Sequence, residues 1–306
     1  MAGTNPFVYG EIVPSDAFLD REDERRQLAR DLLDGQKVFL VAPRRYGKSS
    51  LIGVVLRDLE SRRARTLALT ITQFATYRAF LEAFAESCLR VAGLGARVRE
   101  LIRTVFSLRP ELSWEAQPTG GQELTLRFEP GRSSKEDQRL AREVFALPGL
   151  LAERTGAPWV VALDEFQKIS DFDGNSVEDA LRAAVQTQRR VGYVFSGSEP
   201  SLMARMLRTR RPFYKAGPVL TLSKMPPRVF VDALVERFGA TGFHIDREVA
   251  AELVERAQNV PYDVQRLAHE LWDDAERLAA RRIASPMLQA TTFRLLSAQH
   301  PILEAA

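Results

Sequence analysis

Residues 37–50, which read KVFLVAPRRYGKSS, constrain the fold of this chain more than any other stretch. The apolar run at residues 38–41 predicts a buried strand, and the sequence from Lys48 onward predicts an amphipathic helix. A helix N-terminus presents unpaired backbone N–H groups and a partial positive charge. A tight polar loop between such a strand and such a helix therefore predicts a phosphate-binding site.

The loop residues have individual expected roles. Gly47 lets the backbone turn close to the phosphates, Lys48 reaches the β- and γ-phosphates, and the Ser49 hydroxyl ligates Mg²⁺. The residues expected to hold the nucleotide are Ala42, Pro43, Arg44, Arg45, Tyr46, Gly47, Lys48, Ser49 and Ser50. The stretch departs from G-x-x-x-x-G-K-[ST] at Ala42, which can make the turn if its φ stays negative. A Gly-Lys-Ser sequence alone also fits a surface turn, so the flanking strand and helix carry this prediction.

A second motif, WVVALDE, occupies residues 159–165. Its apolar residues predict a buried parallel strand, and its two carboxylates follow at the carboxyl end, where open α/β sheets bind their ligands. Asp164 is expected to hold Mg²⁺, and Glu165 is expected to orient or polarise an attacking water. Alone, the pair also fits a strand that enters a solvated loop. Together, the two motifs favour a nucleotide hydrolase.

The composition is that of a globular chain. Of the 306 residues, 45% are hydrophobic and 27% are charged, which is ordinary for one large domain with an appendage or for two domains. No apolar run approaches about 18 residues and the N-terminus lacks a signal pattern, so a cytoplasmic protein without membrane association is expected. The single Cys88 is expected in the core, and three scattered histidines argue against zinc.

Strands and helices alternate along most of the chain, which predicts an α/β fold with a parallel sheet covered on both faces. Further strands are expected at residues 66–71, 191–198 and 219–222. Residues 93–132 break the alternation, and the segments 112–116 and 123–128 predict a hairpin inserted into the nucleotide fold. From residue 226 the pattern is helical. The expected domains are a nucleotide-binding core at 1–225, a helical lid at 226–285 and a helical tail at 286–306.

Ser198 ends the expected strand at residues 191–198, and Ser196 lies two residues earlier. A hydroxyl at this position can hydrogen-bond the γ-phosphate or the nucleophilic water, and Ser198 is the better candidate of the two. Serines at strand ends are also common turn formers, so a purely structural role is the alternative.

The two motifs, the number of strands and the helical C-terminal part together resemble AAA+ ATPases. Within them the chain looks most like the archaeal-type ATPase family, which is related to signal-transducing STAND NTPases and to origin-recognition initiators. The segments that carry the resemblance are FLDREDE at 18–24, PRRYGKSSL at 43–51, LDEFQ at 163–167, SGS at 196–198 and VPYDVQRL at 260–267.

The resemblance implies a five-stranded parallel sheet ordered 5-1-4-3-2, flanked by helices, and a C-terminal helical lid. It implies that Ser198 senses the γ-phosphate between the phosphate loop and the Asp164–Glu165 pair. It also implies that Pro261, and with it Arg266, approaches the nucleotide from the lid. The chain departs from the family at Asn259, where a glycine is usual.

An arginine finger is a further implication of the resemblance. Such a residue would reach the γ-phosphate of a neighbouring subunit, and Arg211 is the candidate within a cluster of Arg208, Arg210, Arg211 and Lys215. The same cluster also fits an exposed basic face or a contact to phosphate backbones.

These observations predict an enzyme, a Mg²⁺-dependent ATPase that uses ATP and ADP to drive a conformational or assembly switch in a signalling or partner-recruiting role. A homo-oligomer that forms on ATP binding and a protein partner are expected. The absence of an Asn-Lys-x-Asp motif favours ATP over GTP. One alternative is a DNA-associated AAA+ factor, initiator-like or mobile-element-like, and the net charge of +3 neither supports nor opposes it. The other is a nucleotide-binding scaffold with little turnover.

Overall fold

The computed structural model describes residues 4–10, 19, 21–93, 104–106, 110–116, 122–128, 134–173 and 175–304. The chain forms two compact units. The sheet unit comprises Asp23–Pro43 and Val55–Thr221, and the helical unit comprises Met1–Glu22, Arg44–Val54 and Leu222–Ala306. The domain boundaries expected from the sequence stay a prediction.

A five-stranded sheet forms the centre of the sheet unit, and all of its strand pairs are parallel. Its order is β2-β5-β6-β1-β7. The strands are β1 (Lys37–Val41), β2 (Arg65–Thr70), β5 (Trp159–Asp164), β6 (Val191–Gly197) and β7 (Val219–Thr221). Because the hairpin strands lie outside this sheet, the order equals the expected 5-1-4-3-2 read from the opposite edge. The predicted fold class and strand order are therefore confirmed.

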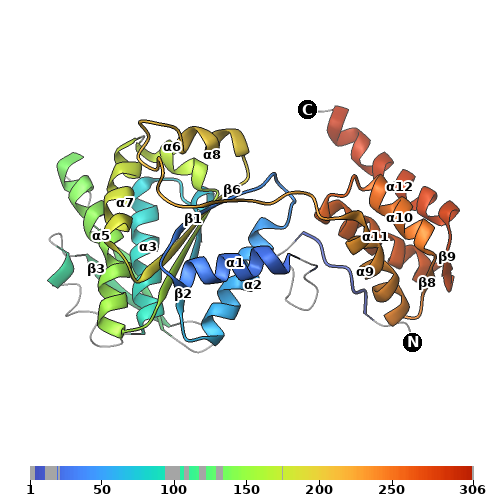
Figure 1. Ribbon diagram of the computed structural model, residues 1–306, viewed down its shortest axis with the longest axis horizontal. Coiled ribbons are helices and arrows are strands. Elements are labelled where there is room, and N and C mark those ends of the chain that lie inside the picture. Colours follow the sequence, from blue (N-terminus) through green and yellow to red (C-terminus); the bar gives the residue numbers. More distant parts are fainter. Residues whose placement is uncertain are drawn as a thin grey trace. The chain divides into compact units, whose positions relative to one another are not determined.

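Helices cover both faces of this sheet (Figure 1). The helices α3 (Tyr77–Ala92), α5 (Ser134–Thr155) and α7 (Asn175–Thr187) pack with alternate strand residues such as Phe39 and Phe195 in one buried cluster. On the other face α1 (Glu22–Leu33) approaches β6 so closely that a Cβ at Gly192 would lie 2.2 Å from the Leu32 carbonyl oxygen. Every residue of β6 is buried, as expected for a central parallel strand.

Short helical segments follow the strands at the carboxyl edge. They are η1 (Ile71–Gln73) after β2, η3 (Phe166–Ile169) and α6 (Ser170–Asp173) after β5, and α8 (Pro200–Met206) after β6. Phe166 of η3 packs on Phe195, with ring centroids 4.5 Å apart, and on Phe213 of the segment before β7. This aromatic packing fixes the position of the chain directly after Asp164 and Glu165.

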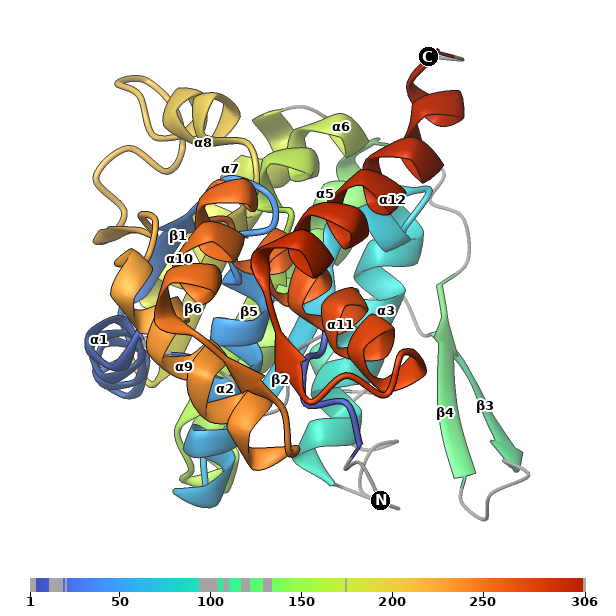
Figure 2. The same ribbon diagram turned by 90° about the vertical axis from the view of Figure 1, so that its right-hand side faces the viewer.

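The predicted hairpin is present as β3 (Glu111–Ala116) and β4 (Gln122–Arg127), an antiparallel pair. Figure 2 shows it beside α3. Two carboxylates of α3 accept hydrogen bonds from backbone N–H groups of this segment, Glu86 from Leu126 at 2.7 Å and Glu82 from Phe128 at 2.9 Å. Leu126 and Phe128 are buried, so the hairpin has the buried face that its alternation predicts.

The helical unit is built from α9 (Pro227–Ala240), α10 (Arg247–Arg256), α11 (Pro261–Arg277) and α12 (Ser285–Glu304). Two short strands, β8 (His244–Ile245) and β9 (Arg282–Ile283), pair in parallel between them. The N-terminal segment belongs to the same core, because Phe7 is buried against Phe238 with ring centroids 4.6 Å apart. Asn5 Nδ2 also donates to the carbonyl oxygen of His269 on α11 at 3.1 Å.

A buried carboxylate joins α12 to α11. The Thr291 hydroxyl donates to Asp274 at 2.7 Å, and Arg294 donates to the same carboxylate at 3.0 Å. Burial alone would raise the pKa of Asp274, but hydrogen bonds from Thr291 and two arginines lower it below its ordinary value. Within the described residues, none of the helices has the length and apolar character needed to cross a membrane.

Candidate functional site

The phosphate loop follows the carboxyl end of β1. Ala42 N–H donates to the Gly197 carbonyl oxygen at 3.2 Å, which extends the β1–β6 pairing by one residue. Ala42 makes its turn without a positive φ, as expected, whereas Gly47 has φ +82°. A Cβ at Gly47 would meet no atom within 4 Å, so its backbone conformation rather than crowding favours glycine there.

The helix that follows the loop is α2 (Lys48–Ser61), and it belongs in part to each unit. Its first turn closes with a hydrogen bond from Leu51 N–H to the Gly47 carbonyl oxygen at 2.9 Å. The side chain of Lys48 is buried, while Ser49 is exposed at the helix N-terminus. The strand, loop and helix predicted from residues 37–50 are thus present. Lys48, which is expected to contact phosphate, and Ser49, which is expected to ligate the metal, both lie in the first turn of α2.

Asp164 is the last residue of β5 and lies at the sheet edge from which the loop leaves. Its Oδ1 accepts a hydrogen bond from the Ser196 hydroxyl at 2.6 Å and another from the Glu165 backbone N–H at 2.9 Å. Ser196 is fully buried on the neighbouring strand β6. The carboxylate is therefore held at a fixed place on the strand end by two neutral donors.

Glu165 has an unusual backbone conformation for a residue with a side chain, with φ 53° and ψ 39° in the left-handed region. Its Oε2 accepts hydrogen bonds from the Ser198 hydroxyl and from Gln167 Nε2, both at 2.6 Å. Strained residues of this kind persist where the surroundings hold them, and they concentrate at functional sites. The conformation turns the Glu165 side chain back toward β6.

Gln167 is the member of this network that the sequence did not identify, although it lies within the LDEFQ segment. It is almost fully buried, and its Oε1 has no hydrogen-bond partner within the described residues. A Cβ at Gly197 would lie 2.7 Å from that oxygen and 2.4 Å from the side chain of Met203. The glycine of the Ser-Gly-Ser segment therefore gives Gln167 the room to reach Glu165.

The donor set at this edge fits Mg²⁺. This cation prefers carboxylate and hydroxyl oxygens, and it is commonly bound by one or two carboxylates together with phosphate oxygens. Asp164 is a carboxylate of this kind, and its orientation is fixed by Ser196. Among the residues that the structure describes, no group of three or more His, Cys, Asp and Glu side chains could hold a metal ion.

Within the helical unit, the first turn of α11 touches the phosphate loop. Tyr262 N–H donates to the Arg45 carbonyl oxygen at 3.4 Å, and the Arg45 guanidinium lies 4.8 Å from the centre of the Tyr262 ring. Arg45 Nη1 also lies 3.5 Å from Asp263 Oδ1. Pro261 is the first residue of α11, so the turn predicted to approach the nucleotide begins beside a loop residue. Its contact with a nucleotide stays a prediction.

Two further residues shape this part of the helical unit. Arg21, which is buried, donates to the carbonyl oxygens of Tyr46 at 3.3 Å and Ser223 at 2.9 Å. Asn259 has φ +56° and donates to the Met225 carbonyl oxygen at 2.6 Å. Asparagine tolerates the left-handed conformation better than most side chains. Asn259 therefore takes up a conformation that glycine usually supplies, which accounts for this departure from the family pattern.

Arg211, the expected arginine finger, forms an ion pair within its own sheet unit. Its Nη2 lies 2.6 Å from Oε1 of Glu178 on α7, and the Glu178 side chain is 0% exposed while that of Arg211 is 32% exposed. Burial raises the pKa of Glu178, and the charge of Arg211 opposes that shift. A role for Arg211 in a neighbouring subunit stays a prediction.

Comparison with solved structures reveals several similar folds. The Walker-type ATPase PABY2304 of Pyrococcus abyssi aligns with a TM-score of 0.60 at 17% identity, over 96% of this chain and 77% of that one. The Orc1 protein of Aeropyrum pernix, solved in complex with DNA, aligns with a TM-score of 0.60 at 18% identity, over 93% and 68%. The RuvB Holliday junction branch migration motor of Thermotoga maritima aligns with a TM-score of 0.53 at 15% identity, over 92% and 71%.

No protein-family model matches the chain, and no curated protein matches its sequence. The likeness to solved structures is therefore one of fold. Together with the strand order and the helical unit, it shows that this chain has the AAA+ P-loop fold.

Proposed function

We propose that this chain binds ATP together with Mg²⁺ and hydrolyses the γ-phosphate. The observation that supports this most strongly is the carboxylate pair Asp164–Glu165, held by Ser196, Ser198 and Gln167 at the sheet edge from which β1 leads into the phosphate loop. The fold shared with an archaeal Walker-type ATPase is the second support.

In this proposal the loop and the first turn of α2 bind the triphosphate. Backbone N–H groups from Arg44 to Ser50 face the phosphate oxygens, and Lys48 contacts the β- and γ-phosphates. Ser49 and Asp164 hold Mg²⁺, which when bound neutralises part of the phosphate charge. Glu165 accepts a hydrogen bond from the attacking water and aligns it with the bond between the γ-phosphorus and the leaving oxygen of ADP.

Ser198 has two functions that are compatible in this mechanism. Its hydroxyl holds Glu165 when no nucleotide is bound, and a γ-phosphate entering the site can take over that hydroxyl as a donor. The Gln167 amide keeps the Glu165 carboxylate in place during the exchange. Ser198 thus acts as the γ-phosphate sensor, and the carboxylate is released toward water only when the triphosphate is present.

The contact between Arg45 and the first turn of α11 suggests how nucleotide binding in the loop could change the helical unit. A triphosphate that draws Arg45 toward its own charge weakens the contacts of this residue with Tyr262 and Asp263, so that occupancy of the loop changes how α11 is held. A conformational switch of this kind fits a signalling or partner-recruiting ATPase of the cytoplasm. ATP-dependent homo-oligomers, a protein partner and Arg211 as a finger acting between subunits belong to the same proposal.

A second candidate function is that of a DNA-associated factor. It is favoured by one of the similar structures, an Orc1 protein in complex with DNA, and by another that is named a Holliday junction branch migration motor. Arg44 and Arg45 in the loop, the Arg208–Lys215 cluster and Arg281–Arg282 are the candidate contacts to phosphates. A nucleotide-binding scaffold with little turnover is the third candidate.

The test is steady-state ATP hydrolysis by the purified chain with Mg²⁺, over a range of protein concentrations. Lys48→Ala and Glu165→Gln should each abolish turnover, because the first removes the phosphate contact and the second removes the charge that orients water. Lys135→Ala and Glu153→Gln make the same chemical changes at exposed positions on α5, and they should leave the rate unchanged. A rate per chain that rises with concentration supports an assembling ATPase.

Three outcomes decide between the candidates. Turnover that is insensitive to Lys48→Ala contradicts the proposed site. Tight ATP binding without turnover at any protein concentration, with or without duplex DNA, supports the scaffold, whereas stimulation of turnover by duplex DNA moves the DNA-associated function ahead.

A further inference from the structure

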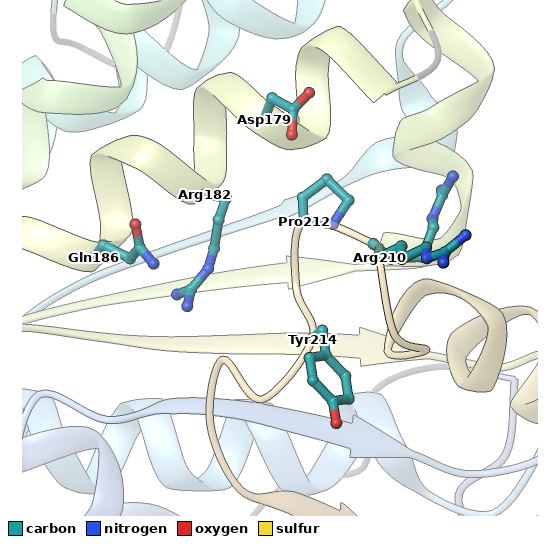
Figure 3. Close-up of a pocket in the computed structure, with 7 residues that line it drawn as sticks. Asp179, Arg182, Gln186, Arg210, Pro212 and Tyr214 are labelled. Atoms are coloured by element: carbon teal, nitrogen blue, oxygen red, sulfur yellow. The ribbon is translucent and has the colours of Figure 1, made fainter.

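A cleft on the sheet unit gathers three arginines, of which only Arg211 has a role in the ATPase proposal above (Figure 3). It has a volume of about 520 Å³ and lies between α7 and the segment that joins α8 to β7. We call it the arginine cleft, and its lining residues are Asp179, Arg182, Gln186, Arg210, Arg211, Pro212 and Tyr214.

The three arginines of the cleft differ in their partners. Arg211 pairs with the buried Glu178 and is held in the wall by it. Arg182 and Arg210, in contrast, have neither a hydrogen-bond acceptor nor an ion-pair partner for their side chains in the described part of the chain. Figure 3 shows Arg182 extending from α7 on the side of Tyr214, while the Asp179 carboxylate points away from that ring. The cleft therefore presents two cations that form no ion pair with its one lining carboxylate, Asp179.

The surroundings of Arg182 strengthen this point. Arg182 is partly buried, and burial lowers the pKa of its guanidinium. Burial, and after it the charge of Arg182, also lower the pKa of Lys37 to about 8. Lys37 is the first residue of β1, whereas the phosphate loop follows the last, so this positive field lies toward the other end of the strand. A bound anion would relieve the repulsion between these two cations.

The segment opposite α7 and its two flanking elements carry only positive charges. Residues 200–221 contain no Asp or Glu, and their cationic side chains are Arg205, Arg208, Arg210, Arg211 and Lys215. Arg210 has φ +73°, a left-handed conformation that is uncommon for a side chain of this size. A row of cations beside a cleft suits a ligand with repeated negative charges better than a single small anion.

Tyr214 indicates which polyanion fits. Tyr214 is 41% exposed, and it lies in the cleft wall next to Pro212. Nucleic-acid sites that accept single strands combine a positive groove with aromatic rings on which bases stack. We infer that the arginine cleft binds a single-stranded nucleic acid, with Arg182 and Arg210 on its phosphate groups and Tyr214 against a base.

This inference does not depend on ATP hydrolysis, so it is tested on the full chain without nucleotide. The probe is a fluorescently labelled oligothymidylate, and its anisotropy is titrated with protein at several salt concentrations. Arg182→Gln and Arg210→Gln should each weaken binding, and each should reduce the slope of log K against log salt by about 0.7 for every phosphate that the arginine neutralises. Tyr214→Leu should weaken binding roughly tenfold without a change in that slope.

Arg65→Gln is the matched control. Arg65 is an exposed arginine at the start of β2, at the sheet edge opposite β7, and its replacement should leave both affinity and slope unchanged. Lys48→Ala should also bind normally, because Lys48 belongs to the proposed ATP site. Failure of the ATPase proposal and failure of this one are thereby distinguished. Circular dichroism of each variant confirms that folding is retained.

Three results would overturn the inference. One is an absence of binding by the wild type at low salt. Another is equal weakening by Arg65→Gln and Arg182→Gln, which would mean that only the overall charge matters. The third is a duplex of the same length competing as well as or better than the single strand, because a duplex cannot offer an unstacked base to Tyr214.

Discussion

Carboxylates held by hydrogen bonds occur in both units of this protein, and they are held in different ways. At the sheet edge, Asp164 and Glu165 receive hydrogen bonds from Ser196, Ser198 and Gln167, which are neutral donors. On α11, Asp274 receives bonds from a threonine and from arginines.

A neutral donor orients a carboxylate without cancelling its charge, whereas an arginine does both. The hydrogen bonds from Ser196, Ser198 and Gln167 therefore orient the carboxylates at the sheet edge without neutralising them. The charge on α11 is used to join helices. We expect changes at the first site to reduce activity with little effect on stability, and changes at the second to do the reverse.

The largest expected effect is that of Asp164→Ala. Removal of the oriented metal ligand should lower the ATP hydrolysis rate by roughly a hundredfold or more, because the metal supplies several kcal/mol of transition-state stabilisation. Turnover and thermal unfolding should be measured on the same preparation. Asp171→Ala removes an exposed carboxylate shortly after β5 and serves as the control. A comparable fall in rate in the control, or a collapse in stability of Asp164→Ala, would break the comparison.

Next in size is the effect of Asp274→Asn on stability. The change removes a charge that two arginines contact, and it should lower the free energy of unfolding by about 1–3 kcal/mol. The ATP hydrolysis rate of the folded protein should stay unchanged. Asp232→Asn is the matched control, since Asp232 pairs with Arg247 at a site where both side chains are more than half exposed. Exposed pairs contribute at most about 1 kcal/mol.

The Asp274→Asn variant should also change how stability depends on pH. The pKa of Asp274 is lower in the folded state than its ordinary value of 3.8, so its contribution to stability is fully present above that value. The contribution disappears as the pH falls through the folded pKa. Urea unfolding between neutral and strongly acidic pH should therefore show a shallower acid destabilisation for Asp274→Asn than for the wild type. Parallel curves would contradict the assignment.

A smaller effect on catalysis is expected for Ser198→Ala. A hydrogen bond to a charged group contributes about 1.5–3 kcal/mol, so loss of the hydroxyl that first holds Glu165 and then donates to the γ-phosphate should slow turnover roughly tenfold. Gln167→Leu should act on the same carboxylate, and the double variant should be impaired by less than the sum of the two single effects. Strict additivity would show that the two donors do not share a target.

The smallest expected effect is that of Asp263→Asn. The Arg45–Asp263 ion pair is 3.5 Å long, and the Arg45 side chain is more than half exposed, so its removal should change ATP affinity only a few-fold. Affinity should rise, because the nucleotide no longer has to displace Asp263 from Arg45, and kcat should stay the same. Isothermal titration measures this directly. A large fall in affinity would instead place Asp263 in contact with the nucleotide.

Much of the fold could be predicted because its signals are local. The strand and helix around residues 37–50, the strand before Asp164 and the hairpin at residues 111–127 each follow from the period of their apolar residues. The strand order followed from the family resemblance. The phosphate loop, Asp164 and Glu165 could be proposed from the sequence because residue type and position at a strand end carry the chemistry, and their roles stay a prediction.

The remaining details depend on side chains that meet across the fold. Ser196 reaches Asp164 only because β5 and β6 are adjacent and in register, and no spacing within either strand encodes that pairing. Arg211 looked like a free cation in the sequence, yet it meets Glu178 through the packing of its segment on α7. Gln167 can reach Glu165 because Gly197 has no Cβ. That space depends on how β6, η3 and α8 pack together, which no single segment of the sequence encodes.

The most direct test of the central claim compares ATP binding with a single turnover in the wild type and in Glu165→Gln. The account predicts that both proteins bind ATP with similar affinity in the presence of Mg²⁺, and that only the wild type converts the bound ATP to ADP. Equal conversion by the two proteins would contradict the role of Glu165, and a wild type that binds no ATP would contradict the proposed site as a whole.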